Sequence, residues 1–257
     1  MKRLAALSIA FACALAGAST AQAADYVRLP GGKFDSVLPQ GSSPSASTTV
    51  DVAPFMLRRT PVTVAQFTAF LRSHPIWLRG RVPEVFAEKA YLRHFPGPAQ
   101  SPAVEVSWFA AKAYCESENA RLPTWIEWEF AAAADETRRD ARSDPAWRRR
   151  ILAWYEQPTG SALAAVGGTP NAYGVSNMHG LVWEWVEDFN ALFIAGDSRT
   201  QGDPDIAKFC GAGALNIVDR DSYAVVMRIA LLSSLNATDT TGTLGFRCAQ
   251  TIDQDPS

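Results

Sequence analysis

Cysteine and histidine are the residues of this 257-residue chain whose types could support redox or metal chemistry. A thiolate or an imidazole makes a local metal site when a second ligand follows at a spacing such as CxxC, HxH or HxxxH. The residues in question are Cys13, Cys115, Cys210, Cys248, His74, His94 and His179, and none of these spacings occurs among them. No local motif therefore supports a zinc or iron site.

The first residues have the pattern of a secretory signal. Lys2 and Arg3 precede an apolar run from Leu4 to Gly17, and Ala21-Gln22-Ala23 places small residues where a signal peptidase cleaves. The apolar run is too short to remain as a membrane anchor. We expect residues 1-23 to be removed and residues 24-257 to form one domain, periplasmic or secreted.

Cleavage changes both the net charge and the cysteine count. The full chain has 24 basic and 26 acidic residues and a net charge of -2, and losing Lys2 and Arg3 leaves 22 basic residues and a charge of -4. Because such a chain has no overall cationic field, we expect neither a nucleic acid nor an anionic membrane as its partner. Three cysteines remain, and an oxidising compartment favours one disulfide and one free thiol; the alternative for each is a small buried residue.

Helix signals are strongest in the first part of the chain. The predicted helices begin at Thr60, Ser107, Thr124, Asp144 and Ser222. The clearest signal is the capping box formed by Thr124 and Glu127, which predicts a helix over 125-134. Glycine and asparagine recur every few residues between Gly167 and Gly213, which favours short strands and long loops. The pattern predicts one α+β domain with few helices.

Four motifs follow one another along the chain in a specific order. They are EVSW with AYC at 105-108 and 113-115, RLPT with EWEFA at 121-124 and 127-131, NAYGVSNMHGLVWEW at 171-185, and LGFRCA at 244-249. Together they resemble the formylglycine-generating enzyme family, also called the sulfatase-modifying factor domain family. The likeness extends from Tyr26 to Ala249, nearly the whole chain after the predicted signal.

The resemblance implies a fold and a disulfide. The fold is a single compact domain of the C-type-lectin-like kind, loop-rich, with few helices and short strands. The disulfide joins Cys115 to Cys248, because family members join the cysteine of AYC to the cysteine of GFRC. The tryptophans of the motifs are expected to be core residues rather than ligand contacts; they are Trp108, Trp128, Trp183 and Trp185.

The resemblance also implies a chemistry that this sequence lacks the residues to perform. Oxidases of the family convert a substrate cysteine to formylglycine with copper bound by two cysteines, which lie between a Gly-Gly-Ser segment and the final GFRC. Here the segment reads Gly211-Ala212-Gly213-Ala214, and no cysteine follows it before Cys248. Carboxylates and guanidiniums do not replace soft thiolates as ligands of copper(I). We therefore expect no copper and no formylglycine oxidase activity.

Calcium is the cofactor that the resemblance implies for this chain. A hard cation prefers oxygen ligands. The ligands implied are the backbone carbonyls of His179, Gly180 and Val182 and the side chain of Glu184. The alternative is that Glu184 is a buried acid held by hydrogen bonds.

The leading functional hypothesis is an extracytoplasmic accessory or maturation factor that binds a secreted partner protein or polypeptide. The sequence is most similar to the family's accessory proteins encoded beside copper nitrite reductases. Asp219, Arg220 and Asp221 are candidate partner contacts, because they lie where the family's active groove is expected. Such alternating charges are also typical of a hydrated loop.

Two other functions stay open. One is an oxidoreductase with a different active site, built from Cys210 with His94, His179 or an imported metal. The other is a lectin-like module that binds a sugar or another ligand, since a fold does not fix a function. Copper content separates the first of these from the accessory factor, and glycan binding tests the second.

Overall fold

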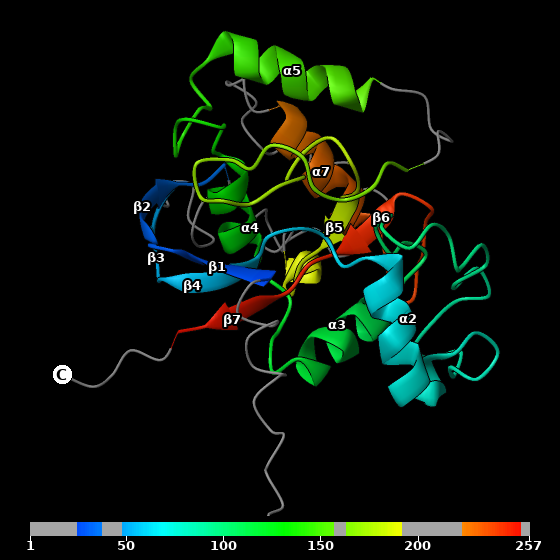
Figure 1. Ribbon diagram of the computed structural model, residues 1–257. Coiled ribbons are helices and arrows are strands. Elements are labelled where there is room, and N and C mark those ends of the chain that lie inside the picture. The colour runs from blue at the N-terminus through cyan, green and yellow to red at the C-terminus, as the bar shows by residue number, and fades with distance from the viewer. Residues whose placement is uncertain (1–24, 38–47, 157–162, 192–222, 253–257) are drawn as a thin grey trace, which may run out of the picture.

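A three-stranded antiparallel sheet lies at the centre of the computed structural model, which describes residues 25–37, 48–156, 163–191 and 223–252. Its order is β1 (Tyr26–Leu29), β4 (Phe55–Arg58) and β7 (Ala249–Thr251), so the start and the end of the described chain pair with the same strand. Figure 1 shows the three strands side by side. This pairing closes the domain.

Two smaller sheets complete the strand structure of the described residues. Strands β2 (Gly32–Asp35) and β3 (Thr49–Val52) pair antiparallel, whereas β5 (Trp183–Trp185) and β6 (Leu244–Phe246) pair in parallel. In the parallel pair Glu184 lies opposite Gly245. A Cβ atom at Gly245 would come within 2.9 Å of the Ala103 carbonyl oxygen. Only glycine at this position therefore lets β6 lie this close to the backbone of Ala103.

The helices begin at residues whose side chains cap them. The described α-helices are α2 (Val64–Ser73), α3 (Trp108–Ser117), α4 (Trp125–Ala132), α5 (Pro145–Tyr155) and α7 (Tyr223–Ser233). Ser107, Thr124 and Asp144 each accept a hydrogen bond from a backbone N–H of the helix that follows. The capping box of Thr124 and Glu127 is confirmed. Short 3-10 turns cover Pro75–Trp77 and Phe189–Ala191.

The prediction that a helix begins at Thr60 is wrong by one turn. Helix α2 has Thr63 as its N-cap, in a capping box with Gln66. The preceding residue, Val62, is held in extended backbone because its N–H donates to Phe246 O and its carbonyl accepts from Ala103 N. These long-range bonds delay the helix start.

The motif tryptophans belong to the core, as expected, although to different degrees. Trp128 and Trp185 are buried, whereas Trp108 and Trp183 are partly buried and pack against the core. Aromatic side chains from α2, α3 and β6 meet at Phe67, Tyr114 and Phe246, with ring centroids 5.3 to 6.0 Å apart. The structure thus has the predicted α+β class: one core, short strands and long connections. No helix in the described ranges combines the length and apolarity of a bilayer span.

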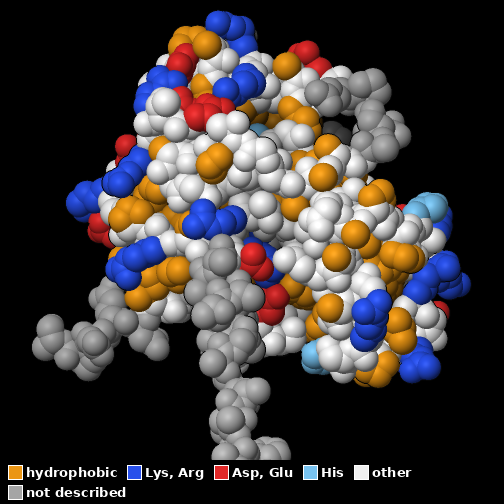
Figure 2. Space-filling view, in the orientation of Figure 1, with side chains coloured by type: hydrophobic (Ala, Val, Ile, Leu, Met, Phe, Trp, Pro, Cys, Tyr) orange, Lys and Arg blue, Asp and Glu red, His pale blue; other side chains and the backbone are white. Residues whose placement is uncertain are grey.

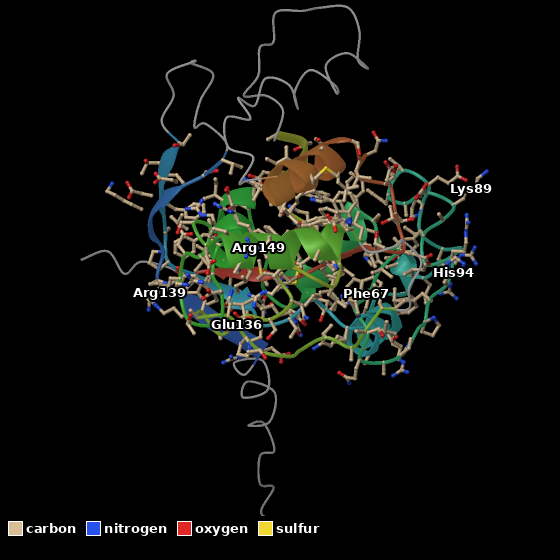
Figure 3. The ribbon with its side chains drawn as sticks, turned by 90° about the horizontal axis from the view of Figure 1, so that it is seen from above. Phe67, Lys89, His94, Glu136, Arg139 and Arg149 are labelled. Atoms are coloured by element: carbon tan, nitrogen blue, oxygen red, sulfur yellow. A yellow bond between two sulfur atoms is a disulfide. The ribbon has the colours of Figure 1, made fainter. Side chains whose placement is uncertain are left out.

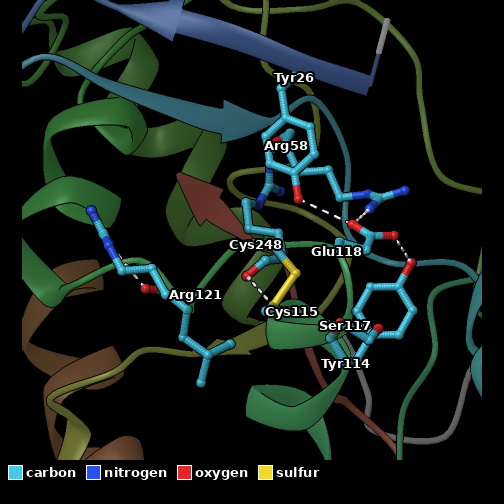
Figure 4. The surroundings of a disulfide bond; sticks show 10 residues. Tyr26, Arg58, Tyr114, Cys115, Ser117, Glu118, Arg121 and Cys248 are labelled. Carbon is cyan, nitrogen blue, oxygen red and sulfur yellow. Dashed lines mark hydrogen bonds and ion pairs between the residues drawn. A yellow bond between two sulfur atoms is a disulfide. The ribbon is translucent and has the colours of Figure 1, made fainter. Parts of the chain in front are cut away.

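The predicted disulfide is confirmed. Cys115 on α3 is bonded to Cys248, which directly precedes β7, across a sequence separation of 133 residues. Figure 4 shows Glu118 beside it, where its carboxylate accepts from Arg58, Tyr26 and Tyr114. The bond and this polar cluster together attach α3 to the central sheet.

Removal of the disulfide tests its energetic role. Replacing Cys115→Ala together with Cys248→Ala should lower the free energy of unfolding by at most about 5 kcal/mol, because the unfolded chain regains the entropy of a long loop. Urea unfolding of the oxidised protein measures the change, and Cys210→Ser is the control that keeps the bond. A peptide map without reduction that links Cys210 to Cys115 or Cys248 would contradict the assignment.

Candidate functional site

A buried ion pair lies where the sequence motifs meet. Glu184, at the centre of β5, faces Arg247, which follows β6, and neither side chain is exposed to solvent. Arg247 Nε donates to Glu184 Oε2 at 2.8 Å and Nη2 donates to Oε1 at 2.7 Å. The indole N–H of Trp128 on α4 donates to the same Oε2 at 2.8 Å. This is the bidentate geometry that a buried pair needs to offset the desolvation of both charges.

The remaining donors of Arg247 reach backbone carbonyls of other segments. Nη1 donates to the carbonyl oxygens of Arg58 and Arg59, at 3.2 and 3.4 Å, and Nη2 to those of Ser176 and Asn177, at 3.1 and 3.2 Å. One guanidinium therefore joins three segments: β5, the end of β4, and the loop at Ser176 and Asn177.

A second buried guanidinium approaches the pair from α7. Arg228 Nη2 donates to the backbone carbonyl of Glu184 at 2.5 Å, and its guanidinium carbon lies 3.5 Å from the ring centroid of Trp128. Burial lowers the pKa of Arg228 to about 10, which still leaves it charged at neutral pH. Its Nε–H has no hydrogen-bond partner among the described residues.

The implied calcium site does not fit this arrangement. Its ligands would be the carbonyls of His179, Gly180 and Val182 with the carboxylate of Glu184. Oε2 of that carboxylate accepts two hydrogen bonds and Oε1 one, and Arg247 already balances its charge. Glu184 has the alternative role, that of a buried hydrogen-bonded acid.

His179 lies next to this cluster and is held as a neutral imidazole. Its Nε2–H donates to the Ala132 carbonyl at 3.0 Å, an assignment that follows because a carbonyl only accepts. The rings of Trp128 and Trp147 meet the imidazole in T-shaped contacts. Burial, the largest cause, lowers the pKa of His179 to about 4. Nδ1 is therefore a buried acceptor, and it has no partner within the described residues.

We name the depression beside His179 the α5 cleft. Its volume is about 390 Å³, and it lies between α5 and the 169-180 loop. Its lining includes Trp147, Trp154, Asn177 and His179, with Arg150 and Glu136 forming an ion pair of 3.0 Å among the lining residues. Figure 3 shows Glu136 and Arg149 on this side of the molecule. The cleft offers aromatic walls beside the ion pair of Arg150 and Glu136, which suits a ligand with both an apolar and a polar part.

An aromatic wall continues from the cleft towards β5. Trp154 and Tyr155 of α5 pack on Trp183, with ring centroids 5.6 and 5.0 Å apart. Burial raises the pKa of Tyr155 to about 12, so its hydroxyl is neutral. The wall supplies stacking surface rather than acid-base chemistry.

The structure brings together some of the residues singled out in the sequence and leaves others undescribed. The four residues implied as calcium ligands lie in one short segment of the site, namely His179, Gly180, Val182 and Glu184. The predicted signal at 1-23, Cys210, and Asp219, Arg220 and Asp221 lie outside the described residues. Sequence reasoning missed the roles of Arg228 and Arg247. A signal was present for Arg228, since it is a lone charge within the apolar run of α7 and such a charge needs a buried partner.

Comparison with known proteins identifies the family. The profile of the "Sulfatase-modifying factor enzyme 1-like domain" matches residues 13–252. The chain belongs to this family. A formylglycine-generating enzyme of Streptomyces coelicolor is 29% identical over 284 residues, which cover 88% of this chain and 89% of the relative.

Relatives within the family carry different functional names. A protein of Bos taurus named "Inactive C-alpha-formylglycine-generating enzyme 2" is 25% identical over 283 residues and covers 91% of both chains. Among solved structures, CarF has a TM-score of 0.49 and 17% identity over 89% of this chain and 98% of its own. Membership in the sulfatase-modifying factor family therefore fixes the fold but not the reaction.

The misfit of the calcium site generates a prediction. Chelation with EDTA should leave the melting temperature of the purified protein unchanged, because Arg247 rather than a cation neutralises Glu184. Differential scanning calorimetry with and without chelator measures this, alongside elemental analysis. A drop in melting temperature that added calcium restores would show that the ion binds here after all.

Burial of neutral His179 predicts a pH dependence of stability. Its pKa falls from 6.5 to about 4 on folding, so between these values the unfolded chain binds more protons than the folded one. The free energy of unfolding should therefore fall by about 2 to 3 kcal/mol as the pH drops through this window, and His179→Gln should remove that part of the slope. Urea unfolding at several pH values measures it. His74→Gln, at an exposed position, is the matched control and should keep the wild-type slope.

Proposed function

We propose that this chain is an extracytoplasmic accessory or maturation factor that binds a partner polypeptide and does not oxidise cysteine to formylglycine. The observation that carries the proposal is that too few cysteines remain for a copper site. Cys115 and Cys248 are bonded to each other, and no cysteine occurs from Gly211 to Arg247. After removal of residues 1-23, Cys210 alone would be free, and a single thiolate does not make the two-thiolate copper site of the family's oxidases.

The fold supports a binding role because its core does not use the missing thiolates. The ion pair of Glu184 and Arg247 is complete without them, and so is the disulfide. A relative named as inactive has the same domain over nearly its whole length, which makes a non-oxidising member of the family a reasonable assignment. Polypeptide binding needs shape, apolar surface and hydrogen bonds, but no metal.

The partner that we propose is a secreted protein, with a copper nitrite reductase system as the first candidate. That choice follows the sequence resemblance to accessory proteins encoded beside such reductases. Periplasmic or extracellular location is part of the same proposal and follows the signal pattern at 1-23.

The absence of oxidase activity is directly testable. The mature protein, incubated with a sulfatase-type cysteine peptide, copper and a reductant, should leave the peptide unchanged, because the residues from Gly211 to Arg247 provide no thiolate. Mass spectrometry of the peptide is the readout. The formylglycine-generating enzyme of Streptomyces coelicolor serves as the positive control.

Conversion of the peptide cysteine to an aldehyde would contradict the proposal. If Cys210→Ser then abolished that conversion, the alternative oxidoreductase built on Cys210 would be favoured. A deletion strain of the native host tests the accessory role: the activity of the secreted reductase should fall while sulfatase activity stays constant. Unchanged reductase activity would exclude the proposed partner.

A further inference from the structure

A second cleft lies beside α2, on a part of the surface that the site above does not use. Its volume is about 440 Å³. Apolar side chains from three segments form most of its lining, namely Leu71, Pro75, Leu78, Leu92, Phe95 and Pro96. We name it the arginine cleft, because Arg72, Arg79 and Arg93 also line it, together with Thr68.

Within the part of the chain that the structure describes, the three arginines of this cleft have no acidic partner. Each is exposed, and none of the three forms an ion pair with another described residue. The segment 72-93 contains five basic residues, Arg72, Arg79, Arg81, Lys89 and Arg93, against the two acids Glu84 and Glu88. One of these acids is already engaged, since Glu88 accepts from the backbone N–H and hydroxyl of Thr240. A chain of net charge -2 thus presents a local cationic surface.

Hydrogen bonds of neighbouring residues hold the segments that line the arginine cleft in place. The Glu105 carboxylate accepts from the backbone N–H of His94 at 2.7 Å and from the His94 ring Nδ1 at 2.5 Å. The backbone carbonyl of Glu105 accepts from the Leu92 N–H at 3.0 Å. The hydroxyl of Tyr91 donates to the Trp77 carbonyl at 2.9 Å, and this bond joins the segment before Leu92 to the segment before Leu78. Because these segments are held by hydrogen bonds, a ligand would find the cleft already formed.

Apolar surface continues beyond the cleft. Ile76, Val85 and Phe86 are 56%, 66% and 37% exposed, and the ring of Phe86 packs against Trp77 at 5.9 Å. Figure 2 shows Lys and Arg side chains beside hydrophobic ones over the region where Figure 1 places α2. Exposed apolar groups rimmed by charged residues are typical of a surface that binds another protein.

We propose that the arginine cleft binds an acidic segment of a polypeptide, with one large apolar side chain between Leu71 and Phe95 and flanking carboxylates paired with Arg72 and Arg93. The inference rests on the proposed function, which requires a polypeptide partner, and names the chemistry of that partner. Guanidiniums bind carboxylates through two parallel hydrogen bonds, and the apolar side chain removes the cleft's surface from water. The charge of the surface selects an acidic segment over a basic one.

Binding of defined peptides to the mature protein tests the proposal. The probe is a short fluorescein-labelled peptide in which a leucine is flanked on both sides by aspartates and glutamates, measured by fluorescence anisotropy. The double variant Arg72→Glu with Arg93→Glu should bind it about tenfold more weakly or worse, since two attractive contacts become repulsive. Arg28→Glu with Arg149→Glu is the matched control: it makes the same charge change at exposed positions outside the cleft and should keep near wild-type affinity.

Three further measurements separate the cleft from general electrostatics. A peptide with serine in place of leucine should bind more weakly, a lysine-rich peptide should not bind, and added salt should weaken binding. Circular dichroism of each variant verifies the fold. Equal loss of binding in both double variants would overturn the proposal, as would binding to anionic lipid vesicles in preference to the peptide.

The outcomes also separate this proposal from the accessory function. Peptide binding that depends on Arg72 and Arg93, in a protein that nevertheless forms formylglycine, would retain the cleft and reject the accessory role. Absent oxidase activity together with no peptide binding would retain the accessory role and reject the cleft.

Discussion

The ion pair between Glu184 and Arg247 is the interaction on which the arrangement of this domain depends. A carboxylate and a guanidinium that are both fully buried are stable only when nearly every donor and acceptor is used. Here the guanidinium bonds to the carboxylate and to four backbone carbonyls, and Trp128 completes the carboxylate's shell. Because those carbonyls belong to segments far apart in sequence, the pair can form only when the segments are in place.

The disulfide and the ion pair act on adjacent residues. Arg247 is followed by Cys248, which is bonded to α3, and then by β7, which pairs with β4. The parallel pairing of β5 with β6 places Glu184 and Arg247 within reach of each other, and Gly245 allows that pairing by leaving room for the Ala103 carbonyl. Three constraints of different kinds, covalent, ionic and steric, thus fall within four consecutive residues. The 244-249 motif is therefore explained by structure, without reference to catalysis.

Local signals in the sequence predicted local structure well and distant partnerships poorly. The start of α4 was predictable because the capping box of Thr124 and Glu127 is complete within four residues. The start of α2 was misplaced because Val62 bonds to Phe246 and Ala103, which no local pattern reveals. The position of Glu184 in the site was expected, but its partner was not, since Arg247 lies 63 residues away and takes the place at the carboxylate that the resemblance implied for calcium. The arginines of the arginine cleft lie close together in sequence, at 72, 79 and 93, but no local pattern shows that they surround one depression.

The separation between the core and the candidate binding surfaces explains how a member of this family can lack the oxidase thiolates and still fold. The groups that hold the core together are the ion pair, the disulfide and the aromatic contacts around Phe67, and none of them is a free thiolate. The α5 cleft and the arginine cleft are lined by residues of α5, α2 and their adjoining loops, and some of these residues, such as Arg72, Arg93 and Arg150, are exposed and lie outside the core. Substitutions of these exposed residues change what is bound at little energetic cost to the core, whereas loss of either partner in the ion pair leaves a buried charge unbalanced. In such a molecule, binding can diverge while the family motifs stay intact, so the motifs identify the scaffold and the clefts must identify the function.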